Sequence, residues 1–438
     1  MSTLPTGWVI ATIPEVAEVL DSLRVPLNAN ERALKVNGKN VAELIPYFGA
    51  TGQVGYTDSY LFNEDIVLLG EDGVPFLDVF KKKAYRVSGK SWVNNHAHVL
   101  RAKILDWRLL ESQLNCLSYV GYVSGSTRLK LTQASMNKLP VIVPPQNEQL
   151  RIADKLDTVL TRVDALNDRL ARITPLLKRF RQSVLAAATS GRLTEDWREE
   201  TQLTTAWPLI SLSEVAKDFS YGSAAKSSKV GDIPVLRMGN IKNGSLDWQD
   251  LVYTSDELEI NKYRLCVGDV LFNRTNSPDL VGKTAVFKGE REAVYAGYLI
   301  RVKCSEKLDA DFLNYCLGSP AGRDYCWKVK SDGVSQSNIN AKKLAAFEFE
   351  LPSIEEQTEI VRRVEILFAY ADRLEARLQT ARTAADRLTP ALLAKAFRGE
   401  LVPQDPNDEP ATELLRRLRE ARAAEAPAKK TRGRKAVV

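Results

Sequence analysis

The chain has 438 residues, of which 44% are hydrophobic and 26% charged. This balance is typical of a globular protein with room for roughly two to four domains, and it excludes a collagen-like chain, a mostly disordered chain and a small disulfide scaffold. The formal net charge of +6 hints at an anionic partner, but the last fourteen residues hold five basic groups and one acid, so any nucleic-acid surface in the body must be a local patch.

Cysteine usage and hydropathy indicate a cytoplasmic protein. The five cysteines are scattered and never spaced Cys-x-x-Cys, which fits reduced thiols better than a disulfide framework or a zinc site. We expect no secretory signal, because the first residues lack a basic stretch followed by an apolar one. No run of about 18 apolar residues occurs, so we expect no membrane span.

In chain order, the sequence predicts two domains of short strands and turns, each followed by a long helix. In the second domain, the runs 233–236, 269–272 and 298–302 are rich in β-branched and aromatic residues and predict strands. The expected segments are a first strand-rich domain at 1–143, a central helix at 144–195, a second strand-rich domain at 196–351, a second helix at 352–403, and a C-terminal helix with a basic disordered tail at 404–438.

An internal repeat explains this alternation. The halves match at an offset of 208 residues near their ends and at an offset of 199 residues near their starts, so the second half carries nine more residues. Between these landmarks we find little identity, which indicates a duplicated scaffold holding two different inserts. The paired landmarks are Trp8 and Trp207, Gly125 and Gly333, residues 143–149 and 351–357, and Gly191 and Gly399.

The repeated segments predict two long helices. Apolar residues recur at alternating spacings of four and three over 152–184 and again over 360–392, which is the pattern of a coiled-coil seam. Each helix could pack on its own domain, but a seam this long that occurs twice favours packing of the two helices on each other. A helix of about 40 residues is roughly 60 Å long and could act as a spacer.

Motifs for catalysis are incomplete. The triplets at 89–91 and 282–284 resemble the end of a phosphate-binding loop but lack its upstream glycine. Residues 276–279 lack the second proline and the aromatic residue of an adenine methyltransferase loop. His96 and His98 are the only histidines, and no cysteine or third histidine accompanies them in a metal pattern, so polar residues at a strand end are the better interpretation. A self-contained enzyme is therefore the least favoured class.

The order of insert, helix, second insert and second helix resembles the specificity subunit of Type I restriction–modification systems, in particular the enteric K-type subgroup. This resemblance implies an α+β fold, with two globular mixed α/β target recognition domains separated by two long helices that form an antiparallel coiled coil with a pseudo-two-fold internal repeat. The stretches that carry the resemblance are 177–185, 191–194, 359–365, 367–372 and 393–401.

The resemblance also implies a function. Each recognition domain would read one half of a bipartite site in double-stranded DNA, and the helices would set the spacer and dock two modification subunits. Those partners would use S-adenosylmethionine to methylate adenine N6, and two restriction subunits would use ATP and Mg²⁺. No cofactor is expected in this chain, which would be a non-catalytic recognition subunit.

Candidate contact residues follow from residue type and position. Arg, Lys, Asn and Gln make most informative base contacts, so polar loops of the inserts are the candidate DNA surface, although each single residue could instead be a solvated or turn-forming group. The DNA candidates are Gln53, Tyr56, Lys90, Asn94, Asn95, Arg128, Lys130, Arg237, Asn240, Lys242, Asn273, Arg274, Asn276, Ser335, Gln336 and Asn338. The partner-binding candidates implied by the resemblance are Glu148, Gln149, Arg179, Phe180, Glu356, Gln357, Phe397 and Arg398.

Two other functions remain open at this point. A structural coiled-coil adaptor would hold two protein-binding domains and show no salt-dependent affinity for DNA. An orphan DNA-binding protein would act without a methyltransferase partner, and the absence of a neighbouring methyltransferase gene would favour it.

Overall fold

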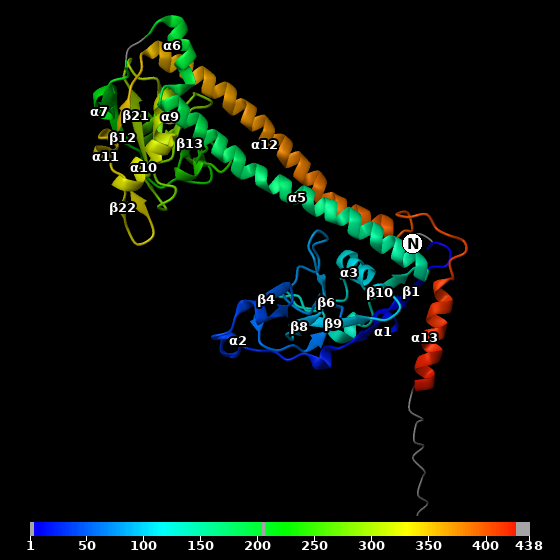
Figure 1. Ribbon diagram of the computed structural model, residues 1–438. Coiled ribbons are helices and arrows are strands. Elements are labelled where there is room, and N and C mark those ends of the chain that lie inside the picture. Colours follow the sequence, from blue (N-terminus) through cyan, green and yellow to red (C-terminus); the bar gives the residue numbers. More distant parts are fainter. Residues whose placement is uncertain (1–3, 204–205, 426–438) are drawn as a thin grey trace, which may run out of the picture. The chain divides into compact units, whose positions relative to one another are not determined.

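A computed structural model describes residues 4–203 and 206–425 (Figure 1). The chain divides into two compact units, Met1–Ala171 with Thr380–Val438 and Arg172–Gln379. We refer to them as unit 1 and unit 2. Each unit contains one strand-rich domain together with a part of both long helices.

Unit 1 is built on two four-stranded sheets. In the first, of order β2-β9-β6-β7, all neighbours are antiparallel. In the second, of order β4-β3-β8-β5, β3 and β8 run parallel, and β1 and β10 form a separate antiparallel pair. The strands are β1 (Val9–Thr12), β2 (Ala17–Val19), β3 (Ile45–Gly49), β4 (Gly52–Thr57), β5 (Phe62–Asn63), β6 (Ile66–Gly70), β7 (Ala84–Val87), β8 (Lys90–Val93), β9 (Ala97–Ala102) and β10 (Pro140–Val143). The domain's helices are α1 (Ile13–Val16), α2 (Ala29–Val36), α3 (Trp107–Cys116) and α4 (Gln133–Met136).

Unit 2 repeats the first of these sheets as β12-β21-β17-β19 and part of the second as β16-β13-β20, in which β13 and β20 run parallel. It also has the smaller sheets β14-β15 and β18-β23-β22. Its strands are β11 (Leu209–Ser211), β12 (Ala216–Tyr221), β13 (Ile233–Leu236), β14 (Ile241–Lys242), β15 (Ser245–Leu246), β16 (Val252–Thr254), β17 (Val270–Asn273), β18 (Thr275–Asn276), β19 (Thr284–Val286), β20 (Val294–Tyr295), β21 (Leu299–Cys304), β22 (Ser331–Asp332), β23 (Ser337–Asn338) and β24 (Glu348–Glu350). Its shorter helices are α6 (Glu195–Thr201), α7 (Leu212–Val215), α8 (Glu257–Tyr263), α9 (Ala310–Gly318), α10 (Pro320–Val329) and α11 (Ala341–Ala345).

The duplication predicted from the sequence is present in the fold. Both domains begin with a strand that pairs with the domain's last strand, β1 with β10 and β11 with β24. Both then form a one-turn helix closed by a capping box, in which Glu15 accepts from the Thr12 N–H at 2.9 Å and Glu214 accepts from the Ser211 N–H at 2.7 Å. The three predicted strand runs correspond to β13, β17 and β21. The helix α10 is an addition in unit 2.

The two long helices, α5 (Gln146–Thr189) and α12 (Ile354–Ala396), lie side by side in each unit (Figure 1). In unit 1, Ile152 near the start of α5 shares a core with Leu393 near the end of α12. In unit 2, Val184 near the end of α5 shares a core with Ile360 near the start of α12. The helices are therefore antiparallel, as the predicted coiled coil requires.

Most of the predicted seam is buried or half-buried, with three departures. Ala381 is exposed, and Leu166 and Leu388 are each 40% exposed. Ala396, beyond the predicted seam, is fully buried. The end of α12 therefore packs on unit 1 through a shifted face, because it covers the strand domain as well as α5. Among the described residues, no helix is long and apolar enough to cross a membrane.

The C-terminal helix α13 (Ala411–Glu425) belongs to unit 1. The Ala411 N–H donates to the Gly7 carbonyl at 2.9 Å, and Leu415 is buried in the core of unit 1. The Arg419 guanidinium pairs with Glu15 at 2.5 Å. A C-terminal helix was predicted within 404–438, and the basic tail predicted after it lies outside the described residues.

Candidate nucleic-acid interface

Each unit brings polar residues together at one end of its central strand. In unit 1 the residue after β6, Glu71, donates its N–H to the His96 carbonyl at 2.8 Å and accepts from the Leu131 N–H at 2.7 Å. In unit 2 the residue after β17, Arg274, repeats both bonds with Tyr298 at 3.0 Å and Ile339 at 2.9 Å. The same backbone framework therefore presents a different set of side chains in each unit. We call these sets the polar edge of unit 1 (Glu71, Asp72, His96, Arg128, Lys130) and the polar edge of unit 2 (Arg274, Thr275, Asn276, Gln336, Asn338).

Carboxylates hold the cations in place at the polar edge of unit 1. Asp72 accepts from His96 Nδ1 at 3.0 Å and from Arg128 Nη2 at 2.7 Å. Burial works to raise the pKa of Asp72, but the hydrogen bonds from His96 and Arg128 outweigh it and hold that pKa below its ordinary value. Lys130 pairs with Glu71 at 3.2 Å. The Arg128 side chain remains 63% exposed, so it can exchange the carboxylate for another acceptor.

None of the five residues that define the polar edge of unit 2 carries a carboxylate, and Asp332 on the neighbouring strand β22 pairs with Lys330 at 2.6 Å. The Arg274 guanidinium lies over the Tyr221 ring, 4.7 Å from its centroid, and donates to the Gly297 carbonyl at 3.3 Å and to Asn338 Oδ1 at 3.4 Å. Asn338 Nδ2 in turn donates to Thr275 Oγ1 at 2.7 Å, across the pairing of β18 with β23. Stacking and hydrogen bonding thus fix the direction of Arg274 before any ligand is present.

Most of the DNA candidates in the inserts are exposed. Gln53 and Tyr56 lie on β4 and Lys90 lies on β8 of the same sheet. Asn95 is exposed in the turn that also carries His96. In unit 2, Ser335 and Gln336 are exposed between β22 and β23, Arg237 pairs with Asp250 at 3.3 Å, and Lys242 pairs with Asp247.

Three asparagines among the DNA candidates are buried, so we do not propose them as base contacts. Asn94 is 8% exposed and its side-chain oxygen accepts from the His96 N–H at 2.8 Å. Asn240 is 3% exposed and closes a turn by accepting from the Arg237 N–H at 2.9 Å. Asn273 is fully buried on β17. The side chains of Asn94 and Asn240 thus stabilise turns, and the burial of Asn273 leaves no surface for a base.

The Glu–Gln pair at the start of each long helix is also buried. Trp8 Nε1 donates to Glu148 at 2.8 Å and Trp207 Nε1 donates to Glu356 at 3.0 Å. Gln149 accepts from the Asp106 N–H and Gln357 accepts from the Asp309 N–H, both at 2.8 Å, at the residues that cap α3 and α9.

The buried Glu–Gln pairs therefore attach each helix to its own domain. Because they are buried, they are not available to a partner subunit, contrary to the prediction from the sequence. Phe397 is 9% exposed in the core of unit 1, and Phe180 packs against the core of unit 2. Arg179 is exposed, and Arg398 is exposed and paired with Glu400 at 2.7 Å. These two arginines are what remains of the predicted partner surface.

Sequence reasoning missed three members of the polar edges, Glu71, Asp72 and Thr275, and also the Tyr221 ring that stacks on Arg274. One signal could have located them: Gly125 and Gly333 match at the same offset as the helices, and each lies in the segment that pairs next to its polar edge.

The two histidines also have structural roles. His98 is buried, with Nδ1 2.6 Å from Asp21 and Nε2 2.9 Å from the Leu131 carbonyl. In the described part of the chain, no cluster of three or more His, Cys, Asp or Glu side chains could hold a metal ion.

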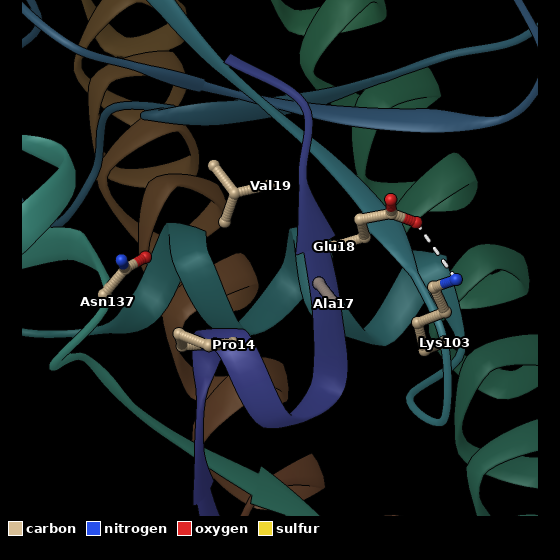
Figure 2. A pocket seen from close by; sticks show the side chains of 6 residues that line it. All are labelled: Pro14, Ala17, Glu18, Val19, Lys103 and Asn137. Atoms are coloured by element: carbon tan, nitrogen blue, oxygen red, sulfur yellow. Dashed lines mark ion pairs between the residues drawn. The ribbon is translucent and has the colours of Figure 1, made fainter. Parts of the chain in front are cut away.

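A hollow on unit 1 is separate from the polar edge. It is lined by Pro14, Ala17, Glu18, Val19, Lys103 and Asn137, and Glu18 pairs with Lys103 at 3.0 Å on one side of it (Figure 2). Lys103 follows the last residue of β9 and His96 precedes the first, so the hollow lies at the opposite end of that strand. The hydrogen bond from Lys103 lowers the pKa of Glu18, which is typical of a surface ion pair and not of an acid–base catalyst.

Comparison with known proteins identifies the family to which the chain belongs. Residues 5–174 and 207–381 each match the Type I restriction modification DNA specificity domain. The chain is 37% identical over 327 residues to the Type I restriction enzyme StySPI specificity subunit of Salmonella potsdam, covering 72% of this chain and 70% of that protein. It is 33% identical over 322 residues to the EcoKI specificity subunit of Escherichia coli strain K12, covering 70% and 69%.

A solved chain from a study of assembly and conformational transition in the type I R-M system has the same fold, with a TM-score of 0.61 at 17% identity over 91% of this chain and 100% of that one. The chain belongs to the Type I restriction–modification DNA specificity family and carries two copies of its domain. It is thus a DNA sequence-specificity subunit, a recognition subunit without a catalytic role of its own, and the predicted likeness to the enteric subunits is confirmed.

Proposed function

We propose that each unit reads one half of a bipartite sequence in double-stranded DNA through its polar edge. The observation that carries this proposal is that the same two backbone hydrogen bonds, made by Glu71 in unit 1 and by Arg274 in unit 2, hold different polar side chains in the two units. Base edges in the major groove differ in their donors and acceptors, so two different side-chain sets select two different half-sites. Arg128 in unit 1 and Arg274 in unit 2 are the best placed to donate to a guanine.

The long helices are proposed to set the unread gap and to dock two modification subunits. Rigid helices fix a length because each residue adds about 1.5 Å. The exposed arginines 179 and 398 lie on or just after these helices and offer donors to a partner. The modification subunits would methylate adenine N6 with S-adenosylmethionine, and two restriction subunits would use ATP and Mg²⁺, so that this chain needs no cofactor. The assembly would act on DNA in the cytoplasm.

An exchange of one domain tests the proposal. Residues 8–143 are replaced by the equivalent residues of a relative, and the chain is assembled with its modification subunits. Methylated adenines are then mapped by long-read sequencing. We expect one half-site to change while the other half-site and the gap stay the same. A change in both half-sites, or in neither, would contradict separate reading by the two units. The unaltered chain and the reciprocal exchange of 207–351 serve as controls.

A further inference from the structure

Three cations of unit 2 gather beside its polar edge. Lys283 ends the loop that begins at Arg274, and its carbonyl accepts from the Asn273 N–H at 2.8 Å. Arg323 of α10 holds the same loop by donating to the Val281 carbonyl at 2.8 Å. Lys242 lies on the β14–β15 hairpin, which packs against β19 directly after Lys283.

The close approach of Arg323 depends on Gly282. A Cβ at Gly282 would lie 3.1 Å from Arg323 Nη1 and 2.6 Å from Cys326 Sγ, and the φ of this glycine is +82°. The hairpin is tied down as well, since Asn314 donates to the Gly244 carbonyl at 2.9 Å and accepts from Thr284 Oγ1 at 2.6 Å. The backbone segments that carry the three cations are therefore held in place.

This cluster is under-neutralised. Lys242 pairs with Asp247, but within the described ranges neither Lys283 nor Arg323 forms an ion pair with a carboxylate. Burial, and then the neighbouring charges of Arg323 and Lys242, lower the pKa of Lys283. Three like charges held together destabilise the free protein, and a bound anion would relieve that repulsion.

Unit 1 provides an internal comparison. Lys83 occupies the position of Lys283, because its carbonyl accepts from the N–H of Gly70, the last residue of β6, at 2.9 Å. Its side chain, however, is 3% exposed and its Nζ lies 3.2 Å from the Asn115 carbonyl. The side chain of Lys83 is thus buried and hydrogen-bonded within unit 1, whereas Lys283 remains partly exposed beside two cations.

We propose that Lys283, Lys242 and Arg323 form a binding site for a DNA backbone phosphate next to the half-site read by unit 2. The inference rests on the proposed function and adds a division of labour to it: the polar edge reads bases, and this cluster fixes register on the backbone. Lys283 is the central group, and Arg323 also positions the loop.

The test uses the full chain assembled with its modification subunits and a duplex carrying the mapped site. Lys283→Gln should make the fall of log affinity with log salt shallower by about 0.9, so that over a fourfold rise in salt the variant loses roughly 3.5-fold less affinity than the unaltered chain. At low salt the variant should bind more weakly than the unaltered chain, by the same factor for duplexes with the correct and with a scrambled unit 2 half-site. Lys283→Arg should keep the slope. Lys288→Gln, at the other end of β19 and paired with Asp311, is the matched control and should also keep it.

Neutral phosphates identify the contact without relying on one variant. A set of duplexes, each with one methylphosphonate, is tested on the unaltered chain and on Lys283→Gln. One methylphosphonate should weaken binding by the unaltered chain and have no further effect on Lys283→Gln. Equal effects on both proteins at every position, or a changed recognition sequence in Lys283→Gln, would overturn the proposal. If the unaltered assembly showed no preference for its site, the proposed function would fail instead.

Discussion

The two buried glutamates that receive a tryptophan indole offer a matched pair for measuring how firmly each helix is locked. Glu356 accepts from Thr194 at 2.7 Å, Arg198 at 2.6 Å and Trp207 at 3.0 Å. Burial raises the pKa of Glu148, whose indole bond to Trp8 is 2.8 Å long. The same substitution to glutamine should therefore have different costs at the two sites.

The free-energy cost of each substitution follows from the hydrogen bonds that glutamine can still form. At Glu356, glutamine removes the charge that faces Arg198 and one acceptor oxygen. Loss of a hydrogen bond to a charged group costs about 1.5–3 kcal/mol, and because the Arg198 side chain is 24% exposed and can rehydrate, we expect about 2–3 kcal/mol in total. At Glu148, the amide oxygen can keep the indole bond and no charge stays buried, so we expect about 1 kcal/mol or less.

Hydrogen exchange read by mass spectrometry can separate these costs, because it reports each helix start by its own peptides. A difference of about 2 kcal/mol corresponds to a roughly 30-fold difference in the opening constant. Glu356→Gln should speed exchange at the start of α12, and Glu148→Gln should speed it much less at the start of α5. Glu355→Gln, an exposed neighbour, is the control. Equal acceleration at both sites would refute the reasoning.

Three further outcomes are expected. Insertion of four residues into α5 adds about 6 Å and should widen the unread gap by just under two base pairs at most, with unchanged half-sites; methylation mapping that shows the original gap in an active protein would contradict the spacer role. His98→Leu strands Asp21 without its buried partner and should lower the free energy of unfolding by roughly 2–4 kcal/mol in urea titrations, and a loss below about 0.5 kcal/mol would count against that role. Gly191→Ala should cost about 1–2 kcal/mol in the same assay, because φ is +75° and the new Cβ would lie 2.9 Å from Arg198, whereas an unchanged midpoint would show that the cap is not strained.

The helices and the repeat could be predicted because their signals are periodic or duplicated. A seam with spacings of four and three determines which face is buried wherever two helices are in contact. The pattern failed at Leu166, Ala381 and Leu388, which are exposed. At the end of α12, packing on the strand domain as well as on α5 changes the buried face without changing the local pattern. Strand runs such as β13 were predictable for a similar reason, since short β-branched stretches bounded by turns carry local information.

The candidate site could be predicted only in part. Arg128 and Arg274 were found because both are arginines in polar loops, and both lie at the polar edges. Asn94 and Asn273 have the same composition around them but are buried, since the direction of a side chain in a turn or at a strand end depends on long-range pairing. The Glu–Gln signature was visible in the sequence, but its tryptophan partner lies about 140 residues earlier in the chain, beyond any local pattern.

Unit 1 is assembled from two stretches of chain with all of unit 2 between them. During synthesis, unit 2 is complete once residue 379 has been made, whereas the first domain still lacks Leu393, Ala396 and Leu415, which are buried in its core. At roughly 5–20 residues per second, the last helix emerges tens of seconds after the first domain. The apolar surface of the first domain that these residues cover stays exposed for that time. A chaperone that binds nascent apolar segments should therefore associate with the first domain for longer than with the second.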